Sequence, residues 1–454
     1  MKAETRDAYE LFHMGARALA ECEAVGMRID VPRLKATIGE VAGKIREMDA
    51  DLRRDEFWNA WRRRYGSSAN MGSRMQLATV LYAFLGHGPK ERSDVSGRAK
   101  MDEDTLTGLS AEVPFLATYL RLEKYKKLRS TYLEGILRET DSDGFLHPSF
   151  NLHLVKSHRS SSDTPNFQNI PTRDKELGGY VRRCFIPRPG HVLVMRDYGA
   201  QEFKVAACFW RDDAMVRYAS DPSLDIHRDM AAECYRLPAD AVPSMCRFFA
   251  KNQFVFPQLY GSWWKACARN LWSAIDKAGL KTVDGIGLKE HLADCGISGF
   301  AEYERHVEEV EDRFHGRFPT WAERKERWWA RYEKKGWFRL LTGFVCSGVY
   351  TRNQAYNIPI QGPAFHCLLW SLIRVVGWVK KSRMRSVVPG QIHDELFGDV
   401  HRDELDDYVA KTTEVMEEKV REAWPWIVVP LSAELAVAEE TWFDKKVVEV
   451  GTDG

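Results

Sequence analysis

The polar and apolar residues along this chain change their spacing from one region to the next. From residue 34 to 64, and again from 114 to 136, apolar residues recur every three or four positions, which predicts helices. Residues 144–210 instead carry short apolar stretches between Pro and Asn turns, which predicts strands. Residues 211–345 return to the helical spacing, and residues 346–454 mix both. We therefore expect an α+β fold with a mostly antiparallel sheet and helical extensions.

Composition sets limits on the partners of the chain. Hydrophobic residues make up 44% of the 454 residues and charged residues 29%, as in soluble globular proteins, and no membrane partner is expected. The formal net charge is +1, so a nucleic-acid partner would need a local basic surface. The nine cysteines include no C-x-x-C pair, which fits free thiols in a reducing compartment and argues against a zinc site or disulfides.

Two acidic residues stand at the ends of predicted strands. Asp197 closes the strand HVLVMRDY, and Asp394 lies between His393 and Glu395 at the tip of a predicted hairpin, VVPGQIHDELFGDV. Two carboxylates on strand ends can hold a pair of Mg²⁺ ions over a phosphate. The period of two points Arg196 to the other face, so it should not neutralise Asp197. Taken alone, Asp197 could instead cap the helix that follows.

A basic helix with aromatic residues follows in CRFFAKNQFVFPQLYG. Arg247 and Lys251 are four residues apart and share one helix face, which suits an anion such as a triphosphate. Phe254, Phe256 and Tyr260 offer flat surfaces for a base and a sugar. The alternative is an ordinary basic pair on the surface.

Three further segments carry groups that suit nucleic acid. In KSHRSSSDTPNFQNIPTR, Arg159, Asn166, Gln168 and Asn169 could read groove edges, or form a polar turn. Gln361 opens an apolar helix in NIPIQGPAFHCLLW and could be a cap. A basic cluster with hydroxyl donors on the helix over 114–136 suits phosphates, although a solvated helix face would look the same: Lys124, Lys126, Lys127, Arg129, Ser130, Thr131 and Tyr132.

Taken in order, these segments resemble the polymerase domain of family A DNA polymerases, the group of bacterial polymerase I and many phage replicases. VLVMRDYGAQEF looks like motif A, D-Y-S-Q-I-E-L, and QIHDEL is similar to motif C. The remaining matches are R-x-S-S…D-P-N-L-Q-N-I-P-x-R over 159–173, D-I-H at 225–227, R-x-x-x-K…Y-G over 247–261, and A-x-N-x-P-I-Q-G-x-A in AYNIPIQGPA. Six matches in the right order are far more specific than any one of them.

The resemblance implies a right-hand polymerase fold with an antiparallel palm sheet, a helical thumb and helical fingers. The expected parts are a palm-associated N-terminal segment (1–35), the thumb (36–143), the palm with motif A (144–210), the fingers with motif B and an inserted element (211–345), and the palm with motif C (346–454).

The resemblance also implies template-directed DNA synthesis that extends a primer 3′-hydroxyl with dNTPs and releases pyrophosphate. Asp197 and Asp394 would hold two Mg²⁺ ions, for which Mn²⁺ can substitute, helped by the backbone carbonyl of Tyr198. Lys251 would pair with the triphosphate and could protonate the leaving group.

Other matched positions would bind the nucleotide or the DNA. Arg247 and His227 would clamp the outer phosphates, Glu202 would crowd a ribose 2′-hydroxyl as part of a steric gate, and Tyr260 would stack near the templating base. Arg159, Gln361 and His393 would donate to the minor groove at the primer end. The thumb residues Lys127, Arg129 and Tyr132 would contact duplex phosphates, and Asn166, Gln168 and Asn169 would also bind DNA.

The chain departs from the family pattern in three places. Motif B has one extra residue between Lys251 and Tyr260, and Phe256 is preferred over Val255 as its aromatic residue, because a kink at Pro257 could absorb the addition. Motif A has Gly-Ala-Gln at 199–201 where Ser-Gln-Ile is usual. The stretch 260–318 is longer than in bacterial members, which predicts a phage-type helical insertion that packs or binds a partner.

The match begins near Tyr9, so we expect no 3′→5′ exonuclease in this chain. Primer–template DNA and dNTPs are the expected partners, and a separate exonuclease, a helicase or a processivity factor could join them. The expected location is the cytoplasm, or the host cytoplasm if a phage encodes the chain. A single-subunit RNA polymerase and a non-catalytic DNA-binding relic are the alternatives, and Glu202 and the intact Asp197, Lys251 and Asp394 argue against them.

Overall fold

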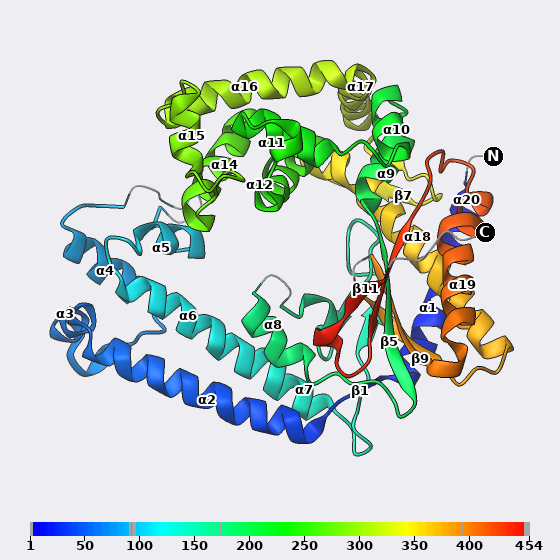
Figure 1. The fold of residues 1–454 in the computed structure, drawn as a ribbon, viewed down its shortest axis with the longest axis horizontal. Helices are drawn as coiled ribbons and strands as arrows, with labels where there is room; N and C mark the ends of the chain where they lie inside the picture. Colours follow the sequence, from blue (N-terminus) through cyan, green and yellow to red (C-terminus); the bar gives the residue numbers. More distant parts are fainter. Residues whose placement is uncertain (1–2, 90–91, 93–96, 172–173, 393, 449–454) are drawn as a thin grey trace. The chain divides into compact units, whose positions relative to one another are not determined.

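The computed structural model describes residues 3–89, 92, 97–171, 174–392 and 394–448, and these form two compact units. The first unit comprises Met1–Arg28, His147–Asn169 and Ile186–Gly454, and the second comprises Ile29–Leu146 and Ile170–Phe185. Figure 1 follows the chain through both units. The mixture of helices with an antiparallel sheet confirms the expected α+β class.

The first unit is built on a five-stranded antiparallel sheet in the order β11-β10-β5-β9-β8. Its strands are β5 (His191–Tyr198), β8 (Val387–Ile392), β9 (Glu395–His401), β10 (Ala433–Ala438) and β11 (Lys446–Val448). The central strand β5 pairs with β9 from His191↔His401 to Asp197↔Glu395. Strands β8 and β9 form the hairpin that was predicted around the acidic tip.

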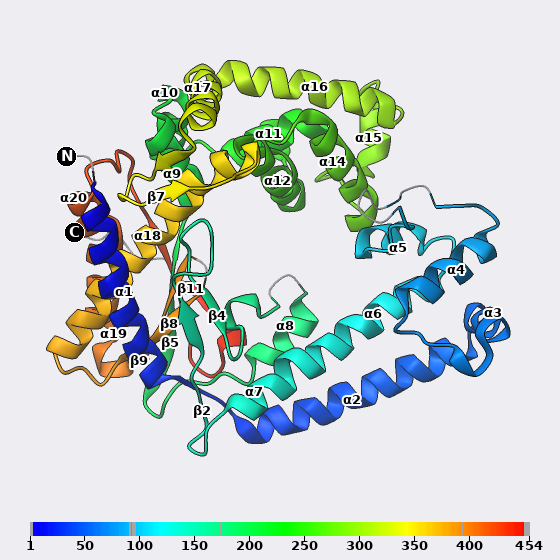
Figure 2. The same cartoon turned by 180° about the vertical axis from the view of Figure 1, so that it is seen from behind.

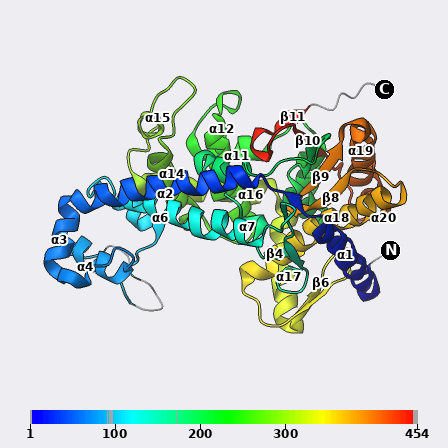
Figure 3. The same ribbon diagram turned by 90° about the horizontal axis from the view of Figure 1, so that it is seen from below.

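Helices cover the sheet face opposite Asp197. They are α1 (Thr5–Val25), α18 (Arg352–Lys381), α19 (Leu405–Thr413), the π-helix η7 (Glu414–Lys419) and α20 (Val420–Ala423). Figure 2 shows α1 running beside α18, and Figure 3 shows α18, α19 and α20 next to the strands. Arg196 is fully buried under this layer and its Nη2 donates to Thr413 Oγ1 at 2.8 Å, which confirms that it points away from Asp197.

Helix α18 corrects one prediction. Gln361 is expected to open this helix, but the helix already begins at Arg352, behind a reciprocal cap between Thr351 and Gln354. Pro359 and Pro363 lie inside it, and a proline normally breaks a helix because it cannot bond the carbonyl four residues earlier.

The carbonyl that Pro359 leaves without its helical partner is used by a neighbouring helix. Trp328 Nε1 donates to the Ala355 oxygen at 2.9 Å, so the helix continues through the proline. Among the described helices, α18 is the one long and apolar enough to cross a membrane, but 67% of its apolar window is buried inside the protein. Its apolar residues are therefore accounted for by the core.

The rest of the first unit is largely helical. Its longer helices are α9 (Gln201–Trp210), α10 (Asp213–Ser220), α11 (Ile226–Tyr235), α12 (Ser244–Ala250), the π-helix η5 (Lys251–Val255), α13 (Phe256–Leu259), α14 (Trp264–Ala278), α15 (Leu288–Asp294), α16 (Phe300–Arg317) and α17 (Pro319–Lys335). The short elements are β1 (Met27–Arg28), β3 (Ser149–Asn151), β4 (Ser161–Asp163), η3 (Phe167–Asn169), η4 (Ala239–Ala241), β6 (Trp337–Arg339), β7 (Val345–Ser347), η6 (Arg402–Glu404) and η8 (Trp442–Asp444). The stretch 260–318 thus adds helices whose buried residues, such as Leu271, Tyr303 and Phe314, join the core.

The second unit is an elongated set of helices with its own core. It contains α2 (Val31–Arg54), α3 (Glu56–Tyr65), η1 (Gly66–Ser68), α4 (Arg74–Leu85), α5 (Glu103–Leu109), α6 (Phe115–Lys127), the π-helix η2 (Leu128–Leu133), α7 (Glu134–Glu139), β2 (Phe145–Leu146) and α8 (Lys175–Arg182). Helices α2 and α6 run side by side, as Figures 1 and 2 show. Asp30 caps α2 by accepting from the Arg33 amide at 2.9 Å, and Trp58, Trp61 and Leu116 lie in the core.

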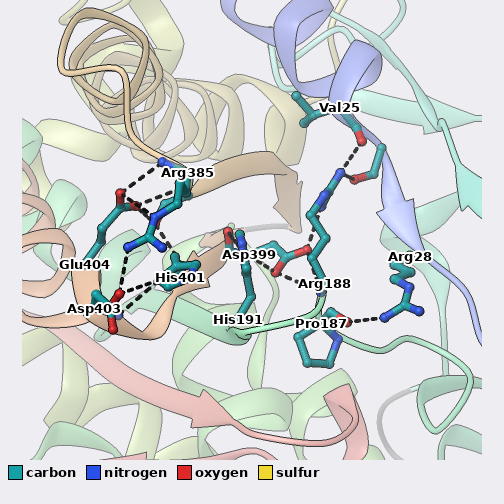
Figure 4. A network of polar contacts seen from close by, with 12 residues as sticks. Val25, Arg28, Pro187, Arg188, His191, Arg385, Asp399, His401, Asp403 and Glu404 are labelled. Atoms are coloured by element: carbon teal, nitrogen blue, oxygen red, sulfur yellow. Dashed lines mark hydrogen bonds and ion pairs between the residues drawn. The ribbon is translucent and has the colours of Figure 1, made fainter.

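A buried ion pair joins the end of α1 to the sheet, as Figure 4 shows. Arg188 Nη1 lies 2.6 Å from Asp399 Oδ2, and the Arg188 Nη2 donates to the Val25 carbonyl at 2.5 Å. His191 Nδ1 lies 3.2 Å from Asp399 Oδ1, and the Asp399 side chain is only 2% exposed. Asp399 therefore contacts side chains from the segment before β5 and from β5 itself.

Asp399→Ala should lower the free energy of unfolding by about 3 kcal/mol, because it leaves the Arg188 guanidinium without its carboxylate in a largely buried site. Chemical denaturation would measure the loss. Asp403→Ala is the matched control in the same network, since Asp403 pairs with Arg385 on the exposed surface and its loss should leave stability almost unchanged. Equal effects of the two substitutions would contradict this account.

Candidate active site

Two strand ends bring the acidic residues together. Asp197 lies directly opposite Glu395 in the β5–β9 pair, and the Tyr198 amide donates to the Asp394 carbonyl at 3.2 Å. Lys445 Nζ lies 2.8 Å from Glu395 Oε2, so Glu395 has a cation of its own. The sequence signal for Lys445 is weak, since it follows a short helical turn near the end of the described chain. Among the described residues, Asp197 forms no ion pair, and Asp394 has only the more distant Arg159.

The crowding of carboxylates changes their protonation. Asp197 keeps a solvent-exposed surface, yet desolvation by the surrounding protein, followed by the charges of Glu395 and Asp394, raises its pKa to about 7. Burial also raises the pKa of Asp394, and the charges of Arg159 and Lys251 oppose that shift. Arg159 Nη2 lies 4.0 Å from Asp394 Oδ1. A cation placed between the two aspartates would relieve their repulsion.

The donor set fits divalent ions that keep other ligands. Within the described ranges, no three His, Cys, Asp or Glu side chains form a complete protein cage for a metal. Mg²⁺ is commonly held by one or two carboxylates, with water and substrate phosphates completing the shell. Asp197, Asp394 and the Tyr198 carbonyl supply hard oxygen ligands of this kind. Tyr198 is anchored on the far face, where its hydroxyl donates to the Met416 carbonyl at 2.9 Å.

Glu202 lies beside the aspartates in the first turn of α9 and holds two of the predicted residues. The Tyr260 hydroxyl donates to one of its carboxylate oxygens, and Arg159 Nη1 lies 3.3 Å from the other. Burial raises the pKa of Glu202, while the hydrogen bond from Tyr260 opposes the shift. Because these contacts come from three separate segments, the local sequence pattern does not predict them.

The extra residue of the Lys251 segment lies in the π-helix η5, which ends just before Phe256 and Pro257. A π-turn adds one residue to a helical turn, so the following residues rejoin the helix in a shifted position. Phe256 stacks on Tyr260 with ring centroids 6.0 Å apart and an 8° interplanar angle, and Lys251 Nζ lies 5.5 Å from its centroid. Phe254 is instead fully buried against Phe314. This arrangement puts Phe256 on the same side as Lys251.

His227 lies next to Phe256, and its ring has no polar partner among the described residues. Its ring centroid is 5.6 Å from that of Phe256, and both ring nitrogens are buried without a hydrogen bond to any described residue. Burial, followed by the charges of Lys251 and Arg247, lowers the pKa of His227 to about 3. Arg247 Nε lies 2.5 Å from Asp225 Oδ2, a residue that also caps α11. An orphaned imidazole beside two cations suits a ligand that carries oxygen atoms.

Several of the remaining predicted residues contact neighbouring side chains of the protein. Gln168 Nε2 donates to Ser160 Oγ at 3.0 Å, and the buried Gln391, which sequence reasoning missed, also donates to Ser160. Asn166 lies 3.5 Å from the hydroxyl of Ser162, and Gln361 is half-buried inside α18. These contacts brace the loop before η3. His393 and the side chain of Asn169 lie outside the described residues.

Three predicted residues belong to the second unit. Lys127 is exposed and forms no ion pair with any described residue, whereas Arg129 Nε lies 2.9 Å from Glu134 Oε1. Tyr132 is half-buried, and burial raises its pKa. All three lie in or next to the π-helix η2.

Comparisons with known proteins match this arrangement. Residues 44–283 and 339–444 match the family model described as DNA polymerase family A. The chain is 28% identical to "DNA polymerase I, thermostable" of Thermus filiformis over 95% of this chain, and 27% identical to "DNA polymerase I" of Bacillus subtilis (strain 168) over 98% of it. Each alignment covers 47% of the relative, so the chain spans about half the length of the curated relatives it matches.

A solved structure extends the comparison to three dimensions. The "POL domain of Pol1 from M. smegmatis complex with DNA primer-template and dNTP" aligns with a TM-score of 0.75 at 25% identity, over 95% of this chain and 70% of that one. The alignment confirms the expected right-hand polymerase fold with a palm sheet and helical thumb and fingers. The family model leaves 284–338 unmatched, which overlaps the expected insertion.

The pKa of Asp197 predicts a pH-dependent stability of the metal-free protein. In the folded protein the Asp197 carboxyl stays protonated up to about pH 7, whereas in the unfolded chain it loses its proton near pH 4. The free energy of unfolding therefore falls as pH rises between these two values. Asp197→Asn cannot ionise. The free energy of unfolding of this variant, measured relative to the unmodified protein, should therefore rise by roughly 1–2 kcal/mol from pH 4 to pH 8, after allowance for solvent screening.

Chemical denaturation in EDTA across this pH range would measure the gain. Asp240→Asn, on an exposed helical turn, is the control and should show the same difference from the unmodified protein at every pH. A constant difference for Asp197→Asn as well would refute the raised pKa.

Proposed function

Because this chain belongs to DNA polymerase family A, we propose that it is a DNA-directed DNA polymerase that extends a primer 3′-hydroxyl with dNTPs on a DNA template. The observation that carries the proposal is the β5–β9 pairing, which brings Asp197 and Asp394 to one end of the sheet. The similarity to a polymerase domain in complex with DNA primer-template and dNTP supports the same partners for this chain.

The proposed metal ligands are Asp197, Asp394 and the carbonyl of Tyr198, and the proposed ions are Mg²⁺ with Mn²⁺ as a substitute. Bound divalent ions would lower the pKa of the primer hydroxyl and stabilise the charge that develops on the phosphates. Asp197 must lose its proton to bind such an ion, so its raised pKa implies weaker ion binding below about pH 7.

The triphosphate would lie along the face that carries Lys251. Lys251 would pair with its oxygens and give a proton to the leaving pyrophosphate. His227 is neutral, so its imidazole would donate one N–H to a phosphate oxygen and gain a partner that the described residues do not offer. Arg247 would exchange its contact with Asp225 for an outer phosphate, and Phe256 would pack against the sugar.

Glu202 and its two partners would control the sugar and the template. Its carboxylate, held by Tyr260 and Arg159, would occupy the space that a ribose 2′-hydroxyl needs. Release of Tyr260 from Glu202 would let its ring stack near the templating base. Arg159, Gln361 and His393 would donate to the minor groove at the primer end, where the acceptors are similar for every correct pair.

The other DNA contacts are proposed by resemblance. Asn166, Gln168 and Asn169 would form the loop that follows the primer terminus. Lys127, Arg129 and Tyr132 would contact duplex phosphates from the thumb, so their loss should flatten the salt dependence of binding. The expected domain boundaries, the phage origin, the cytoplasmic location, the lack of 3′→5′ excision and the accessory proteins stay predictions.

Asp197→Ala and Asp394→Ala should each reduce primer extension more than about 100-fold, because each removes a group preorganised to stabilise charge in the transition state. Binding of primer–template should persist in both variants. A primer-extension assay with a fluorescence-anisotropy binding measurement tests the two parts separately. Asp240→Asn, on an exposed helical turn outside the site, is the control and should extend normally. Extension by either alanine variant at the unmodified rate would exclude the assignment of Asp197 and Asp394.

Phe256→Ala should raise the Kd for dNTP roughly tenfold, the size expected for losing one stacking surface. Phe254→Ala should leave dNTP affinity unchanged and instead destabilise the protein by about 3 kcal/mol, because Phe254 is fully buried. Nucleotide titrations of the ternary complex and chemical denaturation would separate the two effects. If only Phe254→Ala weakened dNTP binding, the proposed position of Phe256 would be wrong.

A further inference from the structure

A cavity of about 390 Å³ lies apart from the residues of the candidate active site. Its volume falls in the range of small-molecule sites. Most of its walls come from α17, β6 and the segments that follow them, and Trp426 adds a ring from near the end of α20. Residues 328–338 of the lining fall in the stretch 284–338 that the family model does not match.

One face of α17 supplies both aromatic and cationic groups to this cavity. Trp328, Arg331, Tyr332 and Lys335 line it and follow the spacing i, i+3, i+4 and i+7, which places them on one side of a helix. Glu333 lies outside this spacing and does not line the cavity. Arg339 from β6 adds a third cation.

The aromatic wall is held in place before any ligand binds. The Phe338 ring lies between Trp328 and Tyr332, with centroid distances of 5.4 Å and 5.7 Å. Trp328 Nε1 donates to the Ala355 carbonyl, and the Tyr332 hydroxyl donates to the Gly348 carbonyl at 2.7 Å. This part of the cavity wall would therefore need little reorganisation when a ligand binds in the cavity.

The cavity also contains an exposed ring and cations that are available to a ligand. Trp337 is 41% exposed, and Lys335 Nζ lies 5.4 Å from its ring centroid. Arg331, Lys335 and Arg339 form no ion pair with any residue that the structure describes. The cavity thus offers an exposed ring and three cations.

Charge distinguishes this cavity from the larger groove of the same unit. That groove, of about 1130 Å³ between α19 and β10, has one lysine and six carboxylates in its lining: Asp406, Glu414, Glu418, Glu439, Glu440 and Asp444. Such a lining repels phosphate. The described lining of the smaller cavity holds three cations and no carboxylate, so it attracts phosphate.

We propose that the cavity binds a nucleobase joined to a phosphate. The base stacks on Trp337, and Arg331, Lys335 and Arg339 bind the phosphate oxygens. A free nucleotide and one unit of a single strand share this chemistry. The site is separate from Asp197 and Asp394, and its occupancy does not depend on the polymerase activity proposed above.

Calorimetric titration in EDTA with dAMP, deoxyadenosine and the pentanucleotide pd(A)5 tests the proposal. Trp337→Ala should weaken binding of dAMP or pd(A)5 roughly tenfold, as expected for the loss of one base-stacking ring. Lys335→Glu should weaken it at least as much, and deoxyadenosine should bind far more weakly than dAMP to the unmodified protein. Binding of dAMP would point to a free nucleotide, and binding of pd(A)5 alone would point to a strand.

Two matched variants control for general effects of a tryptophan or a lysine. Trp263 is 57% exposed and carries Lys265 Nζ 5.4 Å from its ring centroid, but it lies outside the cavity, so Trp263→Ala should bind dAMP normally. Lys334→Glu changes a lysine that does not line the cavity and should leave both ligands unaffected. Circular dichroism would show that the variants are folded.

The cavity proposal and the proposed polymerase activity are contradicted by different outcomes. Unchanged affinity in both Trp337→Ala and Lys335→Glu, or equal losses in their controls, would overturn the cavity assignment. Equal binding of deoxyadenosine and dAMP would overturn the phosphate role. Primer extension by Trp337→Ala should proceed at the unmodified rate, and a failure of the unmodified protein to extend primers would contradict the proposed function without affecting the cavity.

Discussion

The antiparallel pairing of β5 with β9 is the constraint on which the rest of the site depends. It sets Asp197 opposite Glu395 and ties the Tyr198 amide to Asp394, although these residues are far apart in the chain. The backbone hydrogen bonds hold the carboxylates together, and desolvation, followed by the charges of Glu395 and Asp394, raises the pKa of Asp197. The contacts of Tyr198 with Met416 and Ser371 fix the strand from its far side.

Irregular helices provide several of the contacts around this strand. The π-helix η5 carries the extra residue of the Lys251 segment and puts Phe256 near His227 and Tyr260. The π-helix η7 contains Met416, whose carbonyl accepts the Tyr198 hydroxyl. In α18, the carbonyl that Pro359 cannot bond accepts Trp328. Backbone groups released from regular helix geometry thus serve tertiary contacts.

The surfaces of this molecule differ in local charge, although its net charge is close to zero. The formal net charge is +1, yet the strand ends gather aspartates, one groove gathers six carboxylates, and the aromatic cavity gathers three cations. Such separation gives one nearly neutral chain some surfaces that attract cations and others that attract phosphates. Composition alone does not show these local surfaces.

Features that depend on local spacing were predictable from the amino-acid sequence alone. The hairpin around Asp394 follows from an apolar run with a charged tip, and the inward direction of Arg196 follows from the period of two in the strand that carries Asp197. Most helices follow from apolar residues three and four apart. Features that depend on residues far apart in the chain could be seen only in the folded structure. Gln361 lies inside a helix because Thr351 caps it earlier and Trp328 satisfies a carbonyl beside Pro359.

The same distinction applies to the site. The motif order indicated Asp197, Asp394 and Lys251, but Lys445 beside Glu395, the hold of Tyr260 and Arg159 on Glu202, and the unpaired imidazole of His227 could not be read from spacing. Spacing along a chain reports which residues share a strand or helix face. Partners, burial and charge around a side chain depend on segments that only folding brings together.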